Sequence, residues 1–466
     1  MTLQKQPHTY QLSARGLKNL QGILSFLEAE GLLTTITTPV NRKHEVAGLA
    51  KKLEGGNALL FKHILSHEAP IFTGLYWNRE LLSRIFQVET EKLPFLMADA
   101  IQNWRNNPVP PVVQDSGPAN EVISVSSEVD MLQQIPIPTQ GLDEGGPYLT
   151  SCVVIAKDPE TGVRNTSIHR FMVSGSNRLT MQLDMGRHLR DYYERSEKMG
   201  KPLEITINNG VNPAVHIAAV TPSNAAQMDE DELGVASTLL GEPLPLLRSQ
   251  SVEVEGIADA QYIIEGEILP EVRESEGPAA EVTDYYAKKD NRWVVHVKAV
   301  TRRSNPIFHT IIPGREVYNA VGLMAEASIF RNVSQLVPSV QAVFLTYGGC
   351  GFYHAVVQIK KHIEGVQKNA ILATFAAFPS LRRVTIVDED VNIYDPIDVE
   401  WAIATRHDPV KDTIVIPDAI GHELNPMTLE GTVTKIGIDA TAPFPRPRKF
   451  QRIQLQQVDI SKYEIK

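Results

Sequence analysis

Apolar residues recur at helical spacing near the start of the chain. Between residues 17 and 31 they fall on one face of a helix, with Gly31 as a stop signal: Leu17, Leu20, Ile23, Leu24 and Leu27. A short apolar strand follows, and then a second helix near residues 44–53. Residues 103–120 hold four prolines and show little periodicity. They predict a linker, which places the first domain boundary there.

The pattern changes to short apolar runs between about residues 122 and 312. These runs are rich in valine and isoleucine, and glycine, asparagine, aspartate and proline separate them. The runs are SCVVIA, LTMQL, EITIN, AVHIAAV, QYIIEGEI, RWVVHVKAV and IFHTII. Such a series predicts a barrel or a strongly curved sheet.

Beyond about residue 314, helical stretches alternate with buried strands. The helices are expected at 319–330, 365–378 and 396–405, and the strands at AVFLTY, AVVQI, RVTIV and TIVIP. This alternation predicts a layered α/β domain. The chain is therefore expected to be an α/β protein of three domains, at 1–115, 116–312 and 313–466.

Length and composition fit this organisation. The chain has 466 residues, of which 42% are hydrophobic and 21% charged, as in a water-soluble protein of two or three domains. A net charge of -10 argues against nucleic acid as the main partner, although local arginines can still bind a small anion.

No stretch approaches the roughly 20 apolar residues that a membrane span needs, and the N-terminus lacks the pattern of a secretory signal. Two cysteines, Cys152 and Cys350, cannot build a disulfide framework or a zinc site. A reduced, cytoplasmic protein is the simplest interpretation.

One candidate group is the run Asn-Thr-Ser-Ile-His-Arg at 165–170, followed by His188. Asn165 and Arg170 are expected to flank the start of a strand, and His188 to open a polar helix after a turn at Gly186. An amide oxygen and an imidazole can bind a divalent ion, and arginine can grip a carboxylate with two nitrogens. Taken alone, the spacing favours a plainer interpretation, a polar strand and a histidine at a helix start.

Acidic residues form the other candidates. Glu276 and Glu281 bracket a Gly-Pro turn, where two neighbouring acids would separate their pKa values and leave one as a proton donor. Glu232 ends the acidic run at 229–232 and could complete a metal site with Asn165 and His188. The plainer interpretation of both segments is solvated acidic surface.

Taken together and in order, these motifs resemble the signature of UbiD decarboxylases. The signature consists of Asn-Thr-Ser-Ile-His-Arg at 165–170, Met-Gly-Arg-His at 185–188, Glu232 nine residues before Gly241, and Glu-Gly-Pro-Ala-Ala-Glu at 276–281. The resemblance runs from the N-terminal helix to Val-Asp-Glu-Asp-Val at 387–391 and Val-Glu-Trp-Ala-Ile-Ala-Thr-Arg at 399–406. Four spaced motifs in the right order make it far more specific than any one of them.

The resemblance implies a central split-barrel-like domain that binds prenylated FMN. The cofactor phosphate would be bridged by Mn²⁺ or Mg²⁺, with K⁺ close by. Asn165, His188 and Glu232 match the metal ligands, Ile168 matches a residue packed near the flavin, and Arg187 matches a cofactor-binding position. A flavin prenyltransferase would supply the cofactor, and the C-terminal α/β domain would form the contact of a homodimer or larger assembly.

Arg170, Glu276 and Glu281 match the family's catalytic network. Decarboxylation leaves electrons on carbon that no side chain can store, so the modified flavin must act as the electron sink. The protein would orient the carboxylate through Arg170 and protonate the product carbon through Glu281. Glu276 would keep Arg170 and Glu281 correctly positioned relative to each other.

The sequence indicates the substrate less directly than it indicates the cofactor and the reaction. Ala279 and Ala280 stand where family members often have Phe and Gly, which removes an aromatic wall from the loop. The segment at 305–314 most resembles the branch that acts on furan, pyrrole or indole carboxylates, and His309, Arg315 and Tyr318 are candidates for the substrate pocket.

The expected reaction is reversible, non-oxidative decarboxylation of an aromatic or heteroaromatic acid to release CO2. Phenolic acids remain open. Two alternatives are a cinnamate-type acrylic acid decarboxylase and a non-catalytic subunit of a multi-subunit carboxylase.

Overall fold

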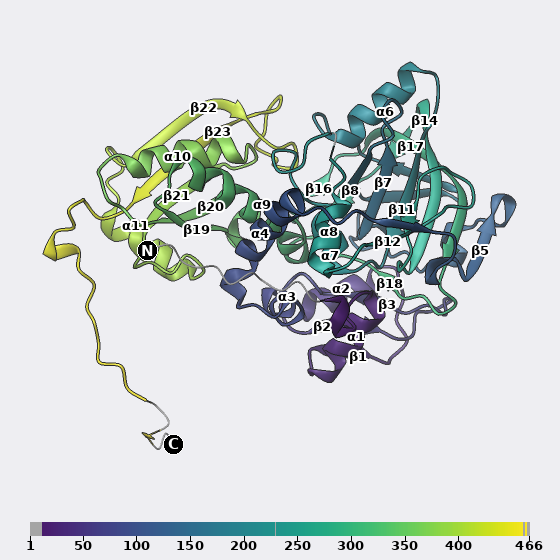
Figure 1. Ribbon diagram of the computed structural model, residues 1–466, viewed down its shortest axis with the longest axis horizontal. Helices are drawn as coiled ribbons and strands as arrows, with labels where there is room; N and C mark the ends of the chain where they lie inside the picture. The colour runs from purple at the N-terminus through teal and green to yellow at the C-terminus, as the bar shows by residue number, and fades with distance from the viewer. Residues whose placement is uncertain (1–11, 229, 460–461, 464–466) are drawn as a thin grey trace.

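The computed structural model describes residues 12–228, 230–459 and 462–463. Figure 1 shows a β-rich body with the N-terminal elements beneath it and the C-terminal elements beside it, and with α4 and α9 between the two lobes. Across the described residues, the helices are all too short or too polar to cross a membrane.

The N-terminal region forms a small four-stranded sheet with helices around it. Its elements are α1 (Leu20–Ala29), β1 (Leu33–Ile36), α2 (Glu45–Lys52), β2 (Ala58–Phe61), β3 (Ile71–Thr73), α3 (Arg79–Phe86) and α4 (Leu93–Asn106). The sheet order is β1-β2-β3-β18, and β18 (Phe308–His309) pairs with β3 in parallel. The chain therefore returns to this sheet more than 200 residues later.

The central region is one nine-stranded sheet of order β6-β9-β10-β17-β14-β11-β7-β8, with β5 added to β17. Its strands are β5 (Val122–Val125), β6 (Tyr148–Leu149), β7 (Cys152–Lys157), β8 (Arg164–Ile168), β9 (Phe171–Gly175), β10 (Arg178–Met181), β11 (Leu203–Asn209), β14 (Tyr262–Glu276) and β17 (Asp290–Arg302). All its pairs are antiparallel. The predicted strand-rich centre is thus confirmed.

Short helices and strands connect this sheet. They are α5 (Met131–Gln134), α6 (His188–Lys198), α7 (Pro213–Ala218), α8 (Leu233–Leu240), β4 (Val112–Gln114), β12 (Pro245–Leu247), β13 (Gly256–Ile257), β15 (Ala279–Ala280) and β16 (Tyr286–Ala287). The helix predicted after Gly186 is α6, which begins at His188.

The C-terminal region is a layered α/β domain, as predicted. It contains α9 (Arg315–Leu336), β19 (Val340–Leu345), β20 (His354–Ile359), α10 (Val366–Ala377), β21 (Arg383–Asp388), α11 (Pro396–Arg406), β22 (Thr413–Ile420) and β23 (Thr432–Ala440). The sheet order is β19-β20-β21-β23-β22. Helices α9 and α10 pack over one hydrophobic cluster and α11 over another, so the sheet lies between layers of helices.

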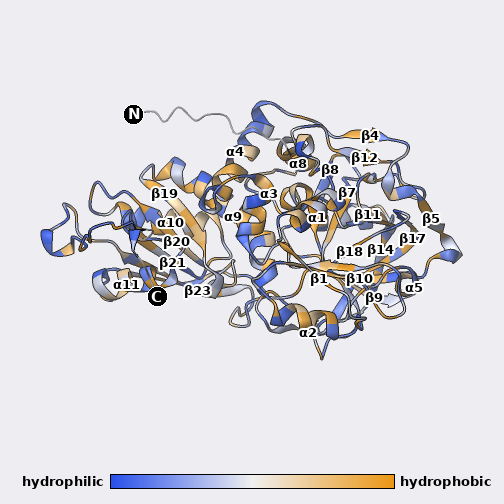
Figure 2. Ribbon diagram, turned by 90° about the horizontal axis from the view of Figure 1, so that it is seen from below, coloured by the Kyte–Doolittle hydropathy of each residue, from blue (hydrophilic) through white to orange (hydrophobic). Residues whose placement is uncertain are grey.

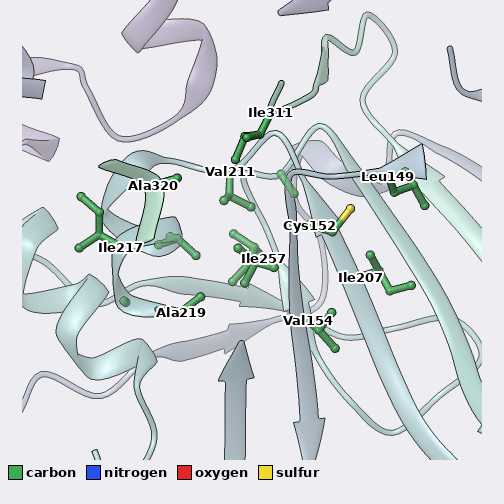
Figure 3. Packing of buried hydrophobic residues seen from close by; sticks show 14 of the residues in the cluster. Leu149, Cys152, Val154, Ile207, Val211, Ile217, Ala219, Ile257, Ile311 and Ala320 are labelled. Atoms are coloured by element: carbon green, nitrogen blue, oxygen red, sulfur yellow. The ribbon is translucent and has the colours of Figure 1, made fainter. Parts of the chain in front are cut away.

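One continuous hydrophobic core extends from Leu12 to Ala327. Figure 3 shows its middle, where Val211 and Ile257 lie between two groups of residues: Cys152, Val154 and Ile207 of the sheet on one side, and Ile217 of α7 and Ala320 of α9 on the other. Figure 2 shows the apolar residues gathered on the strands and on the helix faces that cover them. The N-terminal and central regions therefore share a core, and the start of α9 belongs to it.

Several predictions of local structure were wrong. The run AVHIAAV lies mainly in helix α7, because Pro213 begins the helix and the Asn212 side chain accepts a hydrogen bond from the Ala214 N–H at 2.7 Å. The predicted linker at 103–120 contains the end of α4 and strand β4, which pairs with β12. The strand predicted at IFHTII is reduced to β18, and β23 was not predicted.

Candidate active site

Three candidate metal ligands lie together although they come from separate elements. Asn165 is on β8, His188 is the first residue of α6, and Glu232 immediately precedes α8. Asn165 Nδ2 donates to Glu232 Oε1 at 3.0 Å, and His188 Nδ1 lies 3.8 Å from the same oxygen. The backbone N–H of Thr166 donates to Glu232 Oε2 at 2.9 Å.

Glu232 is buried, with 3% of its surface exposed. Burial raises the pKa of its carboxyl group, and hydrogen bonds from His188 and the backbone oppose the shift. This corrects the interpretation of the acidic run as a solvated turn, at least for its last residue. Asp229, the first residue of the run, lies outside the described residues.

The donor set suits a divalent cation. A carboxylate and an amide oxygen are ligands for Mn²⁺ or Mg²⁺, and imidazole is a common ligand for divalent transition metals. No three His, Cys, Asp or Glu side chains of the described residues lie together so that they could hold a metal ion, and the third donor of this group is an asparagine. A bound ion would require Asn165 to turn its amide oxygen toward Glu232 and His188.

The beginning of α6 suits an anion beside this group. Its N-cap residue is Arg187, whose side chain is exposed and makes no capping hydrogen bond. Free N–H groups in the first turn of an eleven-residue helix attract negative charge. A phosphate bound there would lie next to His188.

The second cluster joins one arginine to two buried glutamates. Arg170 lies between β8 and β9, Glu276 ends β14, and Glu281 follows β15. Arg170 Nε lies 3.4 Å from Glu276 Oε1, and its Nη1 forms an ion pair with Glu281. Glu276 is 1% exposed and Glu281 9%, so the loop is not the solvated acidic surface of the plainer interpretation.

Residues that sequence reasoning missed complete this cluster. The buried Tyr148 hydroxyl donates to Glu276 Oε1 at 2.8 Å, and Arg292 Nε lies 3.8 Å from Glu276 Oε2. Burial, reinforced by Glu276, raises the pKa of Tyr148, so its hydroxyl stays a donor at neutral pH. Neither residue belongs to a recognisable motif: Arg292 reaches Glu276 because β17 pairs with β14, whereas Tyr148 lies on β6, which pairs with β9 and not with β14.

Glu144 braces the loop that carries Glu281. Its Oε1 accepts from the Ala280 N–H at 3.2 Å and its Oε2 from the Gln140 N–H at 2.6 Å. Burial raises the pKa of Glu144, whereas these backbone hydrogen bonds lower it.

Strand β8 connects the two clusters. Asn165 lies on it, Ile168 ends it and packs against the core, and Arg170 follows two residues later. His169 lies between Ile168 and Arg170 in the chain. Burial lowers its pKa to about 4, so its ring is uncharged at neutral pH. Strand β8 therefore links the group of Asn165, His188 and Glu232 to the group of Arg170, Glu276 and Glu281.

The three candidates for the substrate pocket do not all gather. Arg315 and Tyr318, on the first turn of α9, both lie against Tyr347. The Arg315 guanidinium carbon is 5.3 Å from the centre of the Tyr347 ring, and the centres of the Tyr318 and Tyr347 rings are 6.1 Å apart. His309 is buried in the core instead, where its Nδ1 lies 2.9 Å from Ser151 Oγ. Burial lowers the pKa of His309 to about 3, so the ring is neutral.

Comparison with known proteins accounts for this arrangement. The N-terminal, Rift-related and C-terminal domains of 3-octaprenyl-4-hydroxybenzoate carboxy-lyase match residues 24–101, 111–316 and 318–440. The chain belongs to the UbiD family of carboxy-lyases. This confirms the resemblance and the three-domain fold, while the exact domain boundaries stay a prediction.

Solved UbiD-class structures share the whole fold. HmfF from Pelotomaculum thermopropionicum, solved with FMN, is 40% identical, with a TM-score of 0.91 over 96% of this chain and 100% of that one. An evolved dimeric form of HmfF was solved with prFMN, at 39% identity and a TM-score of 0.86 over the same shares of the two chains. The apo 3,4-dihydroxybenzoic acid decarboxylase from Enterobacter cloacae is 30% identical, with a TM-score of 0.90 over 95% of this chain and 98% of that one.

A sequence relative carries a different substrate in its name. Anhydromevalonate phosphate decarboxylase from Methanothermobacter thermautotrophicus is 38% identical over 85% of this chain and 90% of its own. UbiD relatives of similar identity thus act on chemically different acids, and this chain is a UbiD-type decarboxylase.

Proposed function

We propose that this enzyme reversibly decarboxylates an aromatic or heteroaromatic acid with prenylated FMN. The observation that carries the proposal is the pairing of Arg170 with both Glu276 and Glu281 beside a second buried donor group, Asn165, His188 and Glu232. One cluster suits a carboxylate substrate and a proton transfer. The other suits a cation that holds a phosphate.

Prenylated FMN, when bound, supplies the electron sink that carbon–carbon bond cleavage requires. Asn165, His188 and Glu232 would hold a divalent ion against its phosphate, with Arg187 and the start of α6 adding positive charge. Ile168 would lie beside the flavin ring. These assignments rest on the donor chemistry and on the positions that match the family signature.

Arg170 would bind and orient the substrate carboxylate, because a guanidinium offers paired donors. Glu276 would fix the arginine, and Tyr148 in turn holds Glu276 through its hydroxyl at 2.8 Å. Glu281 would deliver a proton to the product carbon after CO2 leaves, and would remove it in the reverse direction. Its position on a braced loop beside Arg170 supports that role.

The similarity to 3,4-dihydroxybenzoic acid decarboxylase supports the aromatic class, and the similarity to HmfF, which was solved with FMN and with prFMN, supports the cofactor. A second candidate is an acrylic-type acid, because anhydromevalonate phosphate is an aliphatic substrate and that relative is 38% identical. The intact Arg170, Glu276 and Glu281 argue against a non-catalytic subunit.

The test is CO2 release from a panel of furan, pyrrole, indole, phenolic and acrylic acids. Enzyme made together with a flavin prenyltransferase should turn over at least one aromatic or heteroaromatic acid, and enzyme made without it should be nearly inactive. Isotope exchange between labelled bicarbonate and the same acid would establish reversibility. Equal activity of the two preparations would contradict the cofactor assignment, and turnover of acrylic acids alone would favour the second candidate.

A further inference from the structure

An ion pair connects the two segments that carry the proposed cation ligands. Arg164 precedes Asn165 on β8. Asp231 precedes Glu232 just before α8, which lies beside β8 in Figure 1 and in Figure 2. Arg164 Nη1 lies 3.2 Å from Asp231 Oδ2. The pair therefore joins the immediate neighbours of two ligands that are 67 residues apart in the sequence.

The ion pair and the ligands lie on opposite faces of β8. Successive side chains of a strand point to opposite faces, so Arg164 and Asn165 point away from each other. Asn165 contacts Glu232, and both residues are buried, at 4% and 3% exposure. Arg164 contacts Asp231, and their side chains are 21% and 25% exposed. Asp231 and Glu232 therefore hold strand β8 from its two faces.

Asp231 also fixes the start of α8. Its Oδ1 accepts a hydrogen bond from the Leu233 N–H at 3.1 Å, while its Oδ2 faces Arg164. Glu232 lies between Asp231 and Leu233 in the chain, and its Oε2 accepts from the Thr166 N–H at 2.9 Å. The Glu232 carboxylate can therefore shift little relative to β8 as long as Asp231 stays paired with Arg164.

Cation binding would make this ion pair more important. The Asn165 amide must turn its oxygen toward the ion, and the turn breaks the 3.0 Å hydrogen bond from its Nδ2 to Glu232. Two of the three polar contacts between β8 and residues 231–232 in the described structure would then remain, one from the Thr166 N–H and one from Arg164. Residues around metal ligands set the placement of those ligands, and tight binding depends on it.

We propose that Arg164 is a positioning residue for the cation site, and that it acts through Asp231 without touching the ion. This inference rests on the proposed cation site. Charge and position predict opposite results when Arg164 is removed. One cation repels another, so the loss of the guanidinium charge alone should tighten metal binding. The loss of the contact that anchors Asp231 should weaken it.

Lys157 provides a matched control. It lies opposite Arg164 in the pairing of β7 with β8, and its Nζ lies 2.9 Å from Glu255 Oε1. Arg164 Nε lies 3.0 Å from the other oxygen of the same carboxylate. The two cations therefore share one acid and are similarly exposed, at 28% and 21% of their side chains. Of the two, it is Arg164 that reaches Asp231.

The test measures the Mn²⁺ dissociation constant of full-length enzyme made with a flavin prenyltransferase. Electron paramagnetic resonance quantifies free Mn²⁺ after equilibration, and flavin absorbance is read on the same samples. Arg164→Met should raise the dissociation constant by at least about 10-fold and lower the flavin content with it. Lys157→Met should leave both nearly unchanged. Urea unfolding without metal should be similar for the two variants, because partly exposed ion pairs contribute little to stability.

A double-variant cycle checks that Arg164 acts through Asp231. Asp231→Asn should also weaken Mn²⁺ binding. Arg164→Met combined with Asp231→Asn should bind no more weakly than the weaker single variant, because the same connection is lost in each case. Additive effects would overturn the proposal, and so would an equal loss of Mn²⁺ binding in Lys157→Met.

The wild type separates a failure of this inference from a failure of the proposed function. Wild-type enzyme that binds no Mn²⁺ would overturn the proposed cation site and this inference with it. Equal or tighter binding by Arg164→Met, beside a wild type that binds Mn²⁺ and flavin, would leave the cation site in place and overturn the positioning role alone.

Discussion

Arg79 and Arg170 are both paired with buried glutamates, yet their surroundings differ. Arg79 and Glu326 are 5% and 0% exposed, and the guanidinium donates to both carboxylate oxygens at 2.9 and 2.6 Å. Its Nε donates to Asn319 Oδ1 at 2.8 Å, and its guanidinium carbon lies 5.0 Å from the centre of the Phe344 ring. Arg170 keeps 20% of its side chain exposed and divides its contacts between two glutamates.

The difference separates a structural ion pair from the one that we propose to be catalytic. Arg79 joins α3 of the N-terminal region to α9, where it is buried against Glu326 and Asn319. Arg170 divides its contacts between two glutamates and stays partly exposed, so it can exchange one of them for a substrate carboxylate. Partial exposure and divided pairing therefore favour a functional role for an arginine, and full burial against one carboxylate favours a structural one.

The largest effect is expected at the catalytic pair. Glu281→Gln keeps the shape of the side chain but cannot deliver the same proton, so turnover should fall about 10²–10⁴-fold. The measurement is proton–deuterium exchange at the product carbon, for whichever acid the enzyme decarboxylates. Bound prenylated FMN should be retained.

Glu276→Gln is the matched variant for this experiment. It should weaken the hold on Arg170 and raise KM for the acid, while some exchange survives. Normal exchange in Glu281→Gln beside a dead Glu276→Gln would show that the two roles are reversed.

A large effect on stability, but not on chemistry, is expected at the structural pair. Arg79→Ala leaves the buried Glu326 without its cationic partner, which typically costs about 3–5 kcal/mol. Denaturant unfolding should show this loss, whereas turnover per folded molecule should stay within about twofold of the wild type. If the variant is as stable as the wild type, the contrast between the two arginines fails.

A smaller, pH-dependent effect is expected at Lys435, a buried cation outside both clusters. It is 4% exposed, it donates to the Pro379 carbonyl, and burial lowers the pKa of its ammonium group to about 8. The unfolded chain, with a lysine pKa near 10.4, binds more protons between pH 8 and 10, so stability gains from this residue as pH rises through that window.

Lys435→Met should therefore add about 1 kcal/mol at pH 7, and its advantage should shrink toward pH 10. Unfolding curves at several pH values measure the difference. The same advantage at pH 7 and pH 10 would show that the ammonium group is not the cause.

Sequence reasoning located the site better than it located its surroundings. Helix α6 and the convergence of Asn165, His188 and Glu232 follow from ordered motifs, since the motifs resemble a known family. The burial of Glu232 and Glu276 did not follow, because an acidic run has the same composition in a core as on a surface.

Tertiary contacts account for the remaining differences. Tyr148 approaches Glu276 through strands far apart in sequence, and no local pattern marks it. The run containing His216 looks like a strand, but the Asn212 cap and Pro213 turn it into α7. His309 lies in the segment whose resemblance to the heteroaromatic branch suggested a pocket, and pairing of β18 with β3 places it in the core.

The central claim is that Asn165, His188 and Glu232 hold a cation through which the flavin phosphate is bound. Flavin absorbance and metal analysis test it on enzyme made with a flavin prenyltransferase, and need no known substrate. Wild type and the control His407→Ala, whose ring lies 2.9 Å from Thr413 in the C-terminal domain, should each carry about one flavin and one divalent ion per chain. His188→Ala should lose both together. A His188→Ala protein with a full complement of flavin and metal would contradict the account.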